Sequence, residues 1–196
     1  MRSPSFAPKQ IATLCAVLSL GICMGLPKHA TAADLSLLSD FGRPDIPAGV
    51  TRGAITTGDV AGISQTGSLN RAYIEQVGQT GNNAESWQEG VELSASIIQN
   101  GASNAARLSQ TGSNDSAVLL QQGTGNQMAI SQLGANVTTD SSQVGDGNQL
   151  VLVQQAGSQF TSTQIGNQNQ LLVDLPVNTF MNVNQTGNNM YLKLGP

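Results

Sequence analysis

Glutamine recurs along this chain at intervals of eleven residues, and Gln99, Gln110 and Gln121 keep the interval without a slip. Its carboxamide both donates and accepts hydrogen bonds, so a buried glutamine costs free energy unless both functions find partners. Identical amides stacked on one another satisfy this need in a continuous ladder. A self-similar period this short is typical of a stacked repeat architecture. The chemistry that these residues predict is therefore hydrogen bonding between repeats rather than a reaction in a pocket.

Asparagine and glycine keep fixed offsets from the repeating glutamines. With Gln at position zero, Gly stands at plus two, Asn or a substitute at plus five, a small or apolar residue at plus seven, an aliphatic at plus nine, and the next Gln at plus eleven. The predicted self-assembly ladder consists of Gln65, Asn70, Gln76, Asn82, Gln88, Gln99, Asn104, Gln110, Gln121, Asn126, Gln132, Gln143, Asn148, Gln154, Gln164, Asn169 and Gln185. The predicted turn glycines, which adopt positive φ without steric cost, are Gly67, Gly78, Gly101, Gly112, Gly123, Gly134, Gly145, Gly166 and Gly187.

The positions that carry this pattern are two residues apart, as Asn104, Ala106, Leu108 and Gln110 show. Residues with this spacing share one face of a β-strand, so we expect the amides and aliphatics to point inward and the intervening residues outward. Each unit is then one strand of about six or seven residues and one tight turn. Two units, about 22 residues, complete a rung, and successive rungs stack about 4.8 Å apart.

We therefore predict an all-β fold, a β-solenoid of ~11-residue strand–turn units with two strands per rung. Thirteen such units fit the chain, and the first runs from Asp59 to Gln65. The regular alternation of aliphatic residues argues against the disorder that a Gln-rich composition would otherwise suggest. The alternation continues to Leu194 without a convincing cap, and an open strand edge is a template for another subunit. The predicted solenoid is accordingly amyloid-forming.

The chain divides into three segments by composition. Residues 1–32 have a basic start, an apolar stretch and an A-x-A cleavage site at Ala30–Ala32, which predict a secretory signal peptide. Residues 33–58 contain several prolines and glycines but no repeat, which predicts a flexible amino-terminal segment. Residues 59–196 form the predicted repeat domain.

Cleavage after Ala32 removes Cys15, Cys23 and His29, which are the cysteines and the single histidine of the chain. The mature chain then has no disulfide, thiol nucleophile, imidazole base or imidazole metal ligand. It keeps five basic and twelve acidic residues, a net charge of −7, and no basic patch for nucleic acid. We expect no enzymatic activity, no catalytic residue, no cofactor, no bound metal and no nucleic-acid partner.

The unit Gln-x-Gly-x-x-Asn-x-Ala-x-Ile/Leu-x-Gln resembles the curlin repeat of bacterial curli subunits. It is complete at residues 65–76, residues 99–110 and 121–132 match nearly as well, and the resemblance extends over about residues 59–194. The resemblance implies a secreted functional amyloid of Gram-negative bacteria. The implied partners are further copies of the chain, other curlin subunits, the outer-membrane curli secretion pore and its accessory proteins. The implied location is an extracellular, pilus-like fibre at the cell surface that supports adhesion and biofilm.

Curli contain a major subunit that forms the bulk of the fibre and a minor subunit that nucleates it. The segment Asn70–Gln76 resembles repeats of the minor subunit, and the Gly-Gly-Gly-Asn turns of major subunits are absent. The last repeat, however, has only Lys193 where some minor subunits end in several basic residues. The resemblance favours the nucleating minor subunit, with the major subunit as the alternative.

Two other classes of function compete with a fibre subunit. A monomeric β-solenoid could bind a ligand or ice through a flat outer face, but that needs a regular Thr-x-Thr array and only Thr161 and Thr163 form such a pair. A solenoid enzyme would need clustered acids or arginines on one face, whereas Arg71 and Arg107 are solitary. Both alternatives rank below the fibre subunit.

Several single residues have two interpretations each. Trp87, Tyr73 and Tyr191 are expected to point outward, where they bind glycans or dyes or simply pack between filaments. Asp115 replaces a ladder asparagine, and it either opposes self-association by charge repulsion or hydrates at a strand end.

The glutamates near Gly90 have two interpretations as well. Glu85, Glu89 and Glu92 either bind calcium or belong to a hydrated loop.

Overall fold

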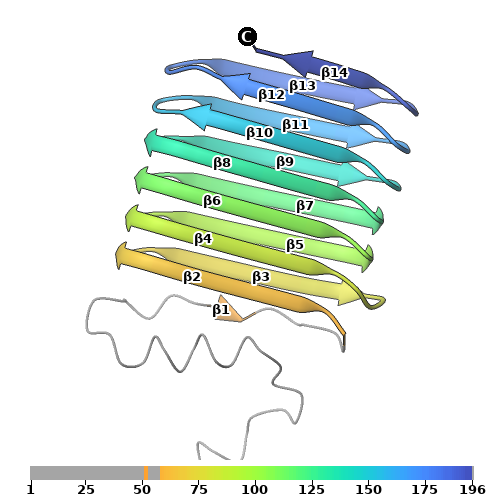
Figure 1. The fold of residues 1–196 in the computed structure, drawn as a ribbon, viewed down its shortest axis with the longest axis horizontal. Coiled ribbons are helices and arrows are strands. Elements are labelled where there is room, and N and C mark those ends of the chain that lie inside the picture. Colours follow the sequence, from red (N-terminus) through yellow and green to blue (C-terminus); the bar gives the residue numbers. More distant parts are fainter. Residues whose placement is uncertain (1–50, 53–57, 196) are drawn as a thin grey trace, which may run out of the picture. The chain divides into compact units, whose positions relative to one another are not determined.

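Each eleven-residue unit folds as one strand and one turn in the computed structural model, which describes residues 51–52 and 58–195 (Figure 1). The strands are β1 (Thr51–Arg52), β2 (Val60–Ser68), β3 (Arg71–Gly78), β4 (Asn83–Val91), β5 (Ser94–Ala102), β6 (Ala105–Ser113), β7 (Ser116–Thr124), β8 (Gln127–Ala135), β9 (Thr138–Val144), β10 (Gln149–Gln155), β11 (Gln159–Ile165), β12 (Gln170–Leu175), β13 (Phe180–Thr186) and β14 (Tyr191–Leu194). The prediction of an all-β solenoid with two strands per rung is confirmed. The thirteen strands from β2 to β14 correspond to the thirteen predicted units.

The predicted signal peptide, residues 1–32, lies outside the described residues, as does most of the predicted amino-terminal segment 33–58. Within that segment, β1 pairs in parallel with Tyr73 and Ile74 of β3. Among the described residues, no helix is long and apolar enough to cross a membrane.

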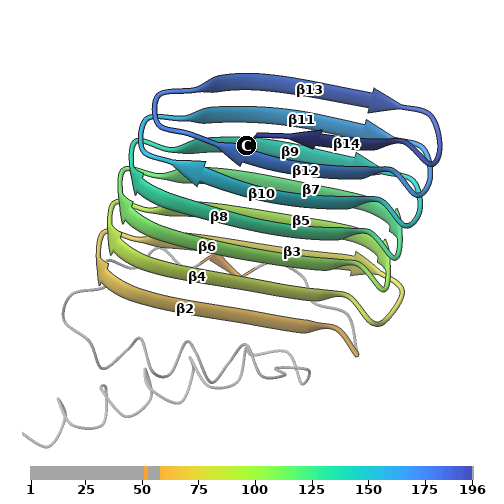
Figure 2. The ribbon, with the colours of Figure 1, turned by 45° about the horizontal axis from the view of Figure 1, so that its top comes forward.

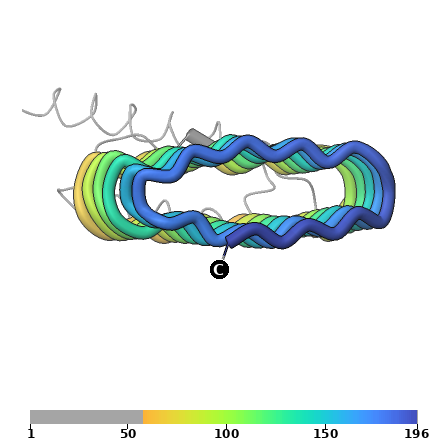
Figure 3. The backbone as a smooth tube through the Cα atoms, turned by 90° about the horizontal axis from the view of Figure 1, so that it is seen from above, coloured from red at the N-terminus to blue at the C-terminus, as the bar shows by residue number. Residues whose placement is uncertain are grey.

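The strands form two parallel sheets of seven strands each, and short arcs join the successive strands from β2 to β14 (Figure 2). Sheet A contains the odd-numbered strands β1 to β13, and sheet B contains the even-numbered strands β2 to β14. Viewed along the stack, the chain traces two flat walls closed by an arc at each end (Figure 3). We call the arcs that follow sheet A strands the A-to-B arcs, and those that follow sheet B strands the B-to-A arcs.

Register is preserved along both sheets although the repeat length changes. In sheet A, Gln76 pairs with Gln99 at a separation of 23 residues, Gln99 with Gln121 at 22, and Gln143 with Gln164 at 21. The arcs absorb the differences, because a one-residue slip within a strand would turn every inward side chain outward.

The interior between the two sheets is a thin apolar layer bordered by amides. Most strands place two small or aliphatic residues inside, as Ala95 and Ile97 do on β5. Strand β9 differs, because its inner positions carry the buried Thr139 and Ser141. The next sheet A strand places Phe160 against Thr139, and this ring is among the largest fully buried side chains. Its bulk fills space that the small polar residues leave in a close-packed interior.

Candidate functional site

The glutamines inside sheet A form one unbroken ladder along the solenoid. Each Nε2 donates to Oε1 of the glutamine in the next rung, at 2.8 Å from Gln76 to Gln99 and 2.8 Å from Gln99 to Gln121. The same bond continues at 3.0, 2.8 and 2.7 Å through Gln143, Gln164 and Gln185. All donors point toward the carboxyl-terminal rung, so the ladder has a direction.

The second amide hydrogen of each glutamine is used as well, across the rung. Gln99 Nε2 donates to the carbonyl oxygen of Asn83 at 3.0 Å, and Gln121 Nε2 to that of Ala105 at 3.0 Å. These carbonyls belong to the opposite sheet, so each amide joins the two sheets as well as two rungs. The bonds hold the polar interior together where an unpaired amide would cost roughly 1–3 kcal/mol.

The glutamine ladder of sheet B is interrupted. It runs from Gln65 through Gln88 and Gln110 to Gln132, with bonds of 2.5, 2.8 and 2.7 Å. Gln132 then donates to Oγ1 of Thr139 at 2.8 Å, and that hydroxyl donates to Oε1 of Gln154.

Two residues that the ladder prediction did not include therefore shape sheet B. Thr139 comes from the opposite sheet and bridges the gap, and Leu175 occupies the ladder position of the following strand. The sequence signal for the bridge is the pair of polar residues Thr139 and Ser141, at inward positions where other units carry aliphatic residues.

An unbroken run of five asparagines lies at the ends of the A-to-B arcs, with Asp59 before it and Met190 after it. Asn82, Asn104, Asn126, Asn148 and Asn169 follow one another there in successive rungs. Each Oδ1 accepts the backbone N–H of the next residue in the series, at 3.1 Å from Asn104 to Asn82 and at 3.1 Å from Met190 to Asn169. Each Nδ2 reaches a glycine carbonyl one rung on, at 2.9 Å from Asn104 to Gly123. The side chains thus replace backbone pairing where the strands turn.

The corresponding position of the B-to-A arcs has lost most of its asparagines. Asn70 is followed by Leu93, Asp115, Val137 and Ser158 in successive rungs. Asn70 still donates to the carbonyl of Gly90 at 3.1 Å, and its Oδ1 accepts the N–H of Leu93 at 3.1 Å. The A-to-B arcs thus keep their run of asparagines, whereas the B-to-A arcs keep only Asn70 of theirs.

All seventeen predicted ladder residues lie inside the solenoid, and none has more than 8 % of its surface exposed. All nine predicted turn glycines have positive φ, and Gly90, which the prediction left out, has φ +144°. Gly90 stands two residues after Gln88, so the spacing of the repeat itself was the signal for it. Glycine is required because the arcs stack closely: a Cβ on Gly101 would collide with the carbonyl oxygen of Gly123 in the next rung.

The family comparison agrees with this geometry. The family model of the curlin associated repeat matches residues 101–134, which include all of β6 and β7 and nearly all of β8. Residues 101–134 carry the curlin associated repeat. This match supports a curli-type amyloid subunit in general. No curated protein and no solved structure matches the chain.

Asp115 stands at a ladder position and buries its carboxyl group, since only 1 % of its surface is exposed. Its Oδ1 accepts the backbone N–H of Val137 at 2.9 Å. Its Oδ2 has no hydrogen-bond partner in the part of the chain that the structure describes. Burial raises the pKa of this carboxyl above its ordinary value, and the bond from Val137 only partly opposes the change. Hydration at a strand end, one of the two interpretations of Asp115, is therefore wrong.

Replacing Asp115 with asparagine is expected to stabilise the fold by about 1–3 kcal/mol at neutral pH, since it removes a buried charge and an unpaired acceptor. The folded chain holds the Asp115 proton more tightly than the unfolded chain does, so wild-type stability falls as pH rises through the raised pKa. The gain from Asp115→Asn should thus be small in acid and largest at neutral pH. Guanidinium unfolding at several pH values measures this gain in the free energy of unfolding. The same substitution at the exposed Asp140, Asp140→Asn, serves as control. A gain independent of pH would contradict this assignment.

The outward residues of the solenoid have few partners. Arg107 Nε lies 2.9 Å from Glu85 Oε2, and the Tyr73 hydroxyl donates to Glu75 Oε2 at 2.6 Å. Trp87 is 62 % exposed and Tyr191 is 66 % exposed. Among the described residues, no three acidic, cysteine or histidine side chains come close enough together to hold a metal ion.

Proposed function

We propose that this chain is a secreted subunit of curli-like fibres, acting as the minor subunit that nucleates polymerisation at the cell surface. The fibres would support adhesion and the biofilm matrix. The observation that carries the proposal is the directed glutamine ladder of sheet A, because all its bonds repeat one contact. A contact that joins one rung to the next within the chain can join one subunit to the next, and such a contact does not close on itself.

The first rung of sheet B presents a hydrogen-bond acceptor that a second subunit could use. Gln65 is 8 % exposed, and its Oε1 has no hydrogen-bond partner among the described residues, although every bond of that ladder calls for a donor from the rung before. A buried acceptor without a donor costs free energy. A stacked amide from a second curlin strand would remove this cost. The ladder residues and turn glycines are, on this proposal, the residues of self-assembly.

The nucleating role is supported by the repeat at Asn70–Gln76, which resembles repeats of minor subunits. The major fibre-forming subunit is the second candidate. Export by a signal peptide in residues 1–32 and the outer-membrane curli pore, with its accessory proteins, belongs to the same proposal. A monomeric ligand- or ice-binding solenoid ranks below both, because nothing in such a protein calls for an open ladder.

The proposal is tested by polymerisation kinetics. Residues 33–196, purified in denaturant and diluted, should show a lag in thioflavin fluorescence that preformed fibres abolish. The fibres should give a meridional reflection at about 4.7–4.8 Å. A folded monomer that never seeds would overturn the fibre assignment.

Nucleation is separated from elongation by a mixing experiment. Trace amounts of this chain should shorten the lag of a major curlin subunit more than the same amount of that subunit's own monomer. An equal effect would assign this chain to the major class while leaving the fibre assignment intact.

A further inference from the structure

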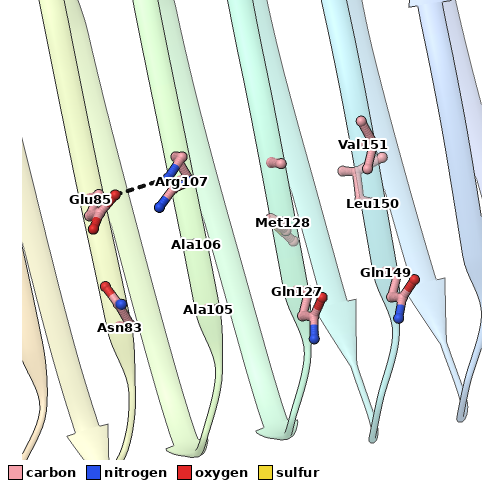
Figure 4. Close-up of a pocket in the computed structure, with 11 residues that line it drawn as sticks. Asn83, Glu85, Ala105, Ala106, Arg107, Gln127, Met128, Gln149, Leu150 and Val151 are labelled. Carbon is pink, nitrogen blue, oxygen red and sulfur yellow. Dashed lines mark hydrogen bonds and ion pairs between the residues drawn. The ribbon is translucent and has the colours of Figure 1, made fainter.

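Two shallow hollows lie side by side on the outer face of sheet B, and Glu85 and Arg107 line both. The first has a volume of about 270 Å³ and crosses the strands from β4 to β10 (Figure 4). The second has a volume of about 580 Å³ and crosses β2, β4 and β6 beside Trp87. We call the two hollows together the sheet B trough. It runs across the strands, so a long ligand bound there would meet one rung after another.

The first hollow presents neutral amides at the spacing of the rungs. Asn83, Ala105, Gln127 and Gln149 are in register on β4, β6, β8 and β10 and point outward. Neighbouring strands are about 4.8 Å apart, so an amide recurs at nearly every such step. Figure 4 shows the amides of Gln127 and Gln149 projecting side by side from neighbouring strands. Each amide offers both donors and an acceptor, which suits a ligand with many hydroxyl groups.

The second hollow adds an open aromatic surface. Trp87 is the only tryptophan of the chain and is 62 % exposed. Its neighbours in register are Ser64 and Ser109, whose short side chains leave the indole uncovered, and Gly62 adds no side chain to the floor. An exposed indole gains little from the fold, but it is a flat apolar platform for a ligand with a polar rim.

The charges of the trough select against ionic ligands. Arg107 and Glu85 neutralise each other at 2.9 Å, and the rest of the lining is uncharged. Glu89 follows Trp87 on the same outer face of β4, and the chain is acidic, so a polyanion would be repelled. An extended peptide gains its affinity by backbone pairing at a sheet edge, which a sheet face does not offer.

We propose that the sheet B trough binds a neutral linear polysaccharide. A sugar ring stacks on Trp87, and hydroxyl groups along the polymer exchange hydrogen bonds with the Glu85–Arg107 pair and with Gln127 and Gln149. This function is separate from fibre assembly, because the ladders lie inside the solenoid and the trough lies outside it. In a stacked fibre the troughs would recur with every subunit, which raises avidity.

The test is a titration of the full-length chain with a neutral β-1,4-linked glucan hexasaccharide. Since Trp87 is the only tryptophan, its fluorescence reports the site directly, and calorimetry gives the affinity of every variant. Trp87→Ser copies the residue found in register on both neighbouring strands, and it should weaken binding about tenfold or more. The double variant Gln127→Ala/Gln149→Ala should weaken it about tenfold as well. Gln122→Ala, an exposed glutamine on the outer face of sheet A, is the matched control and should bind as the wild type does.

Three results would overturn the proposal. The first is equal affinity in the wild type and Trp87→Ser. The second is equal affinity for a polyuronate and for the neutral glucan. The third is a shift of Trp87 fluorescence with an oligolysine peptide but not with the glucan. Thioflavin kinetics of the same variants report assembly separately, so a failure of glycan binding with normal fibre growth affects only this proposal.

Discussion

Replacing Gln121 with leucine is expected to lower the free energy of unfolding by about 3 kcal/mol, because it leaves one buried amide N–H and one buried amide oxygen unpaired at roughly 1–3 kcal/mol each. Gln99 Nε2 loses one of its two acceptors, and Gln143 Oε1 loses its donor, across bonds of 2.8 and 3.0 Å. The added apolar side chain does not compensate, since its neighbours in the ladder above and below stay polar. We also expect a longer lag in fibre formation, because the broken ladder is the contact proposed to propagate.

The matched control is the next residue of the same strand. Gln122 points outward from β7 and is exposed, so Gln122→Leu should change stability by no more than about 0.5 kcal/mol. Equilibrium guanidinium titrations of both variants measure the difference. Equal losses in the two variants would show that the amide ladder contributes no more than any glutamine of the repeat.

Replacing Gly112 with alanine is expected to destabilise the fold by about 3–4 kcal/mol, more than the roughly 1–3 kcal/mol of backbone strain alone. Gly112 has φ +144°, and a Cβ there would collide with the carbonyl oxygen of Gly134 in the next rung. Strands β6 and β8 cannot move apart to relieve the collision without losing the 2.7 Å bond from Gln110 to Gln132. The same obstruction should recur at each contact between rungs, so we expect this variant to seed wild-type chains poorly.

Gly125 provides the control for the collision. It also has positive φ, at +68°, but no atom lies within 4 Å of the position a Cβ would take. Gly125→Ala should therefore cost only the left-handed backbone conformation, about 1 kcal/mol. Thermal or guanidinium unfolding of the two variants distinguishes steric stacking from backbone preference. Equal costs would show that close approach of the arcs is not what selects glycine.

The repeat architecture could be predicted from the sequence because its determinants are local. A period of eleven, with inward residues two apart, fixes strand, turn and the side on which each amide lies. The membership of the ladder and the position of the turn glycines follow from the same spacing. Asp115 shows the limit of this reasoning: the sequence places it in the ladder, but its burial depends on the rungs above and below.

What the sequence determined by itself is therefore the unit: one strand, one glycine turn and inward amides. The tertiary structure alone decided how the units differ. Alternate units fall on opposite sheets, so the glutamine ladder is intact in sheet A and interrupted in sheet B, where Thr139 bridges it from across the interior. The tertiary structure also brings Glu85 within 2.9 Å of Arg107, 22 residues away in the sequence. It forms the sheet B trough beside Trp87 as well. The physical reason is that neighbours in space are a full rung apart in sequence, so side-chain partners are set by stacking register rather than by the eleven-residue pattern.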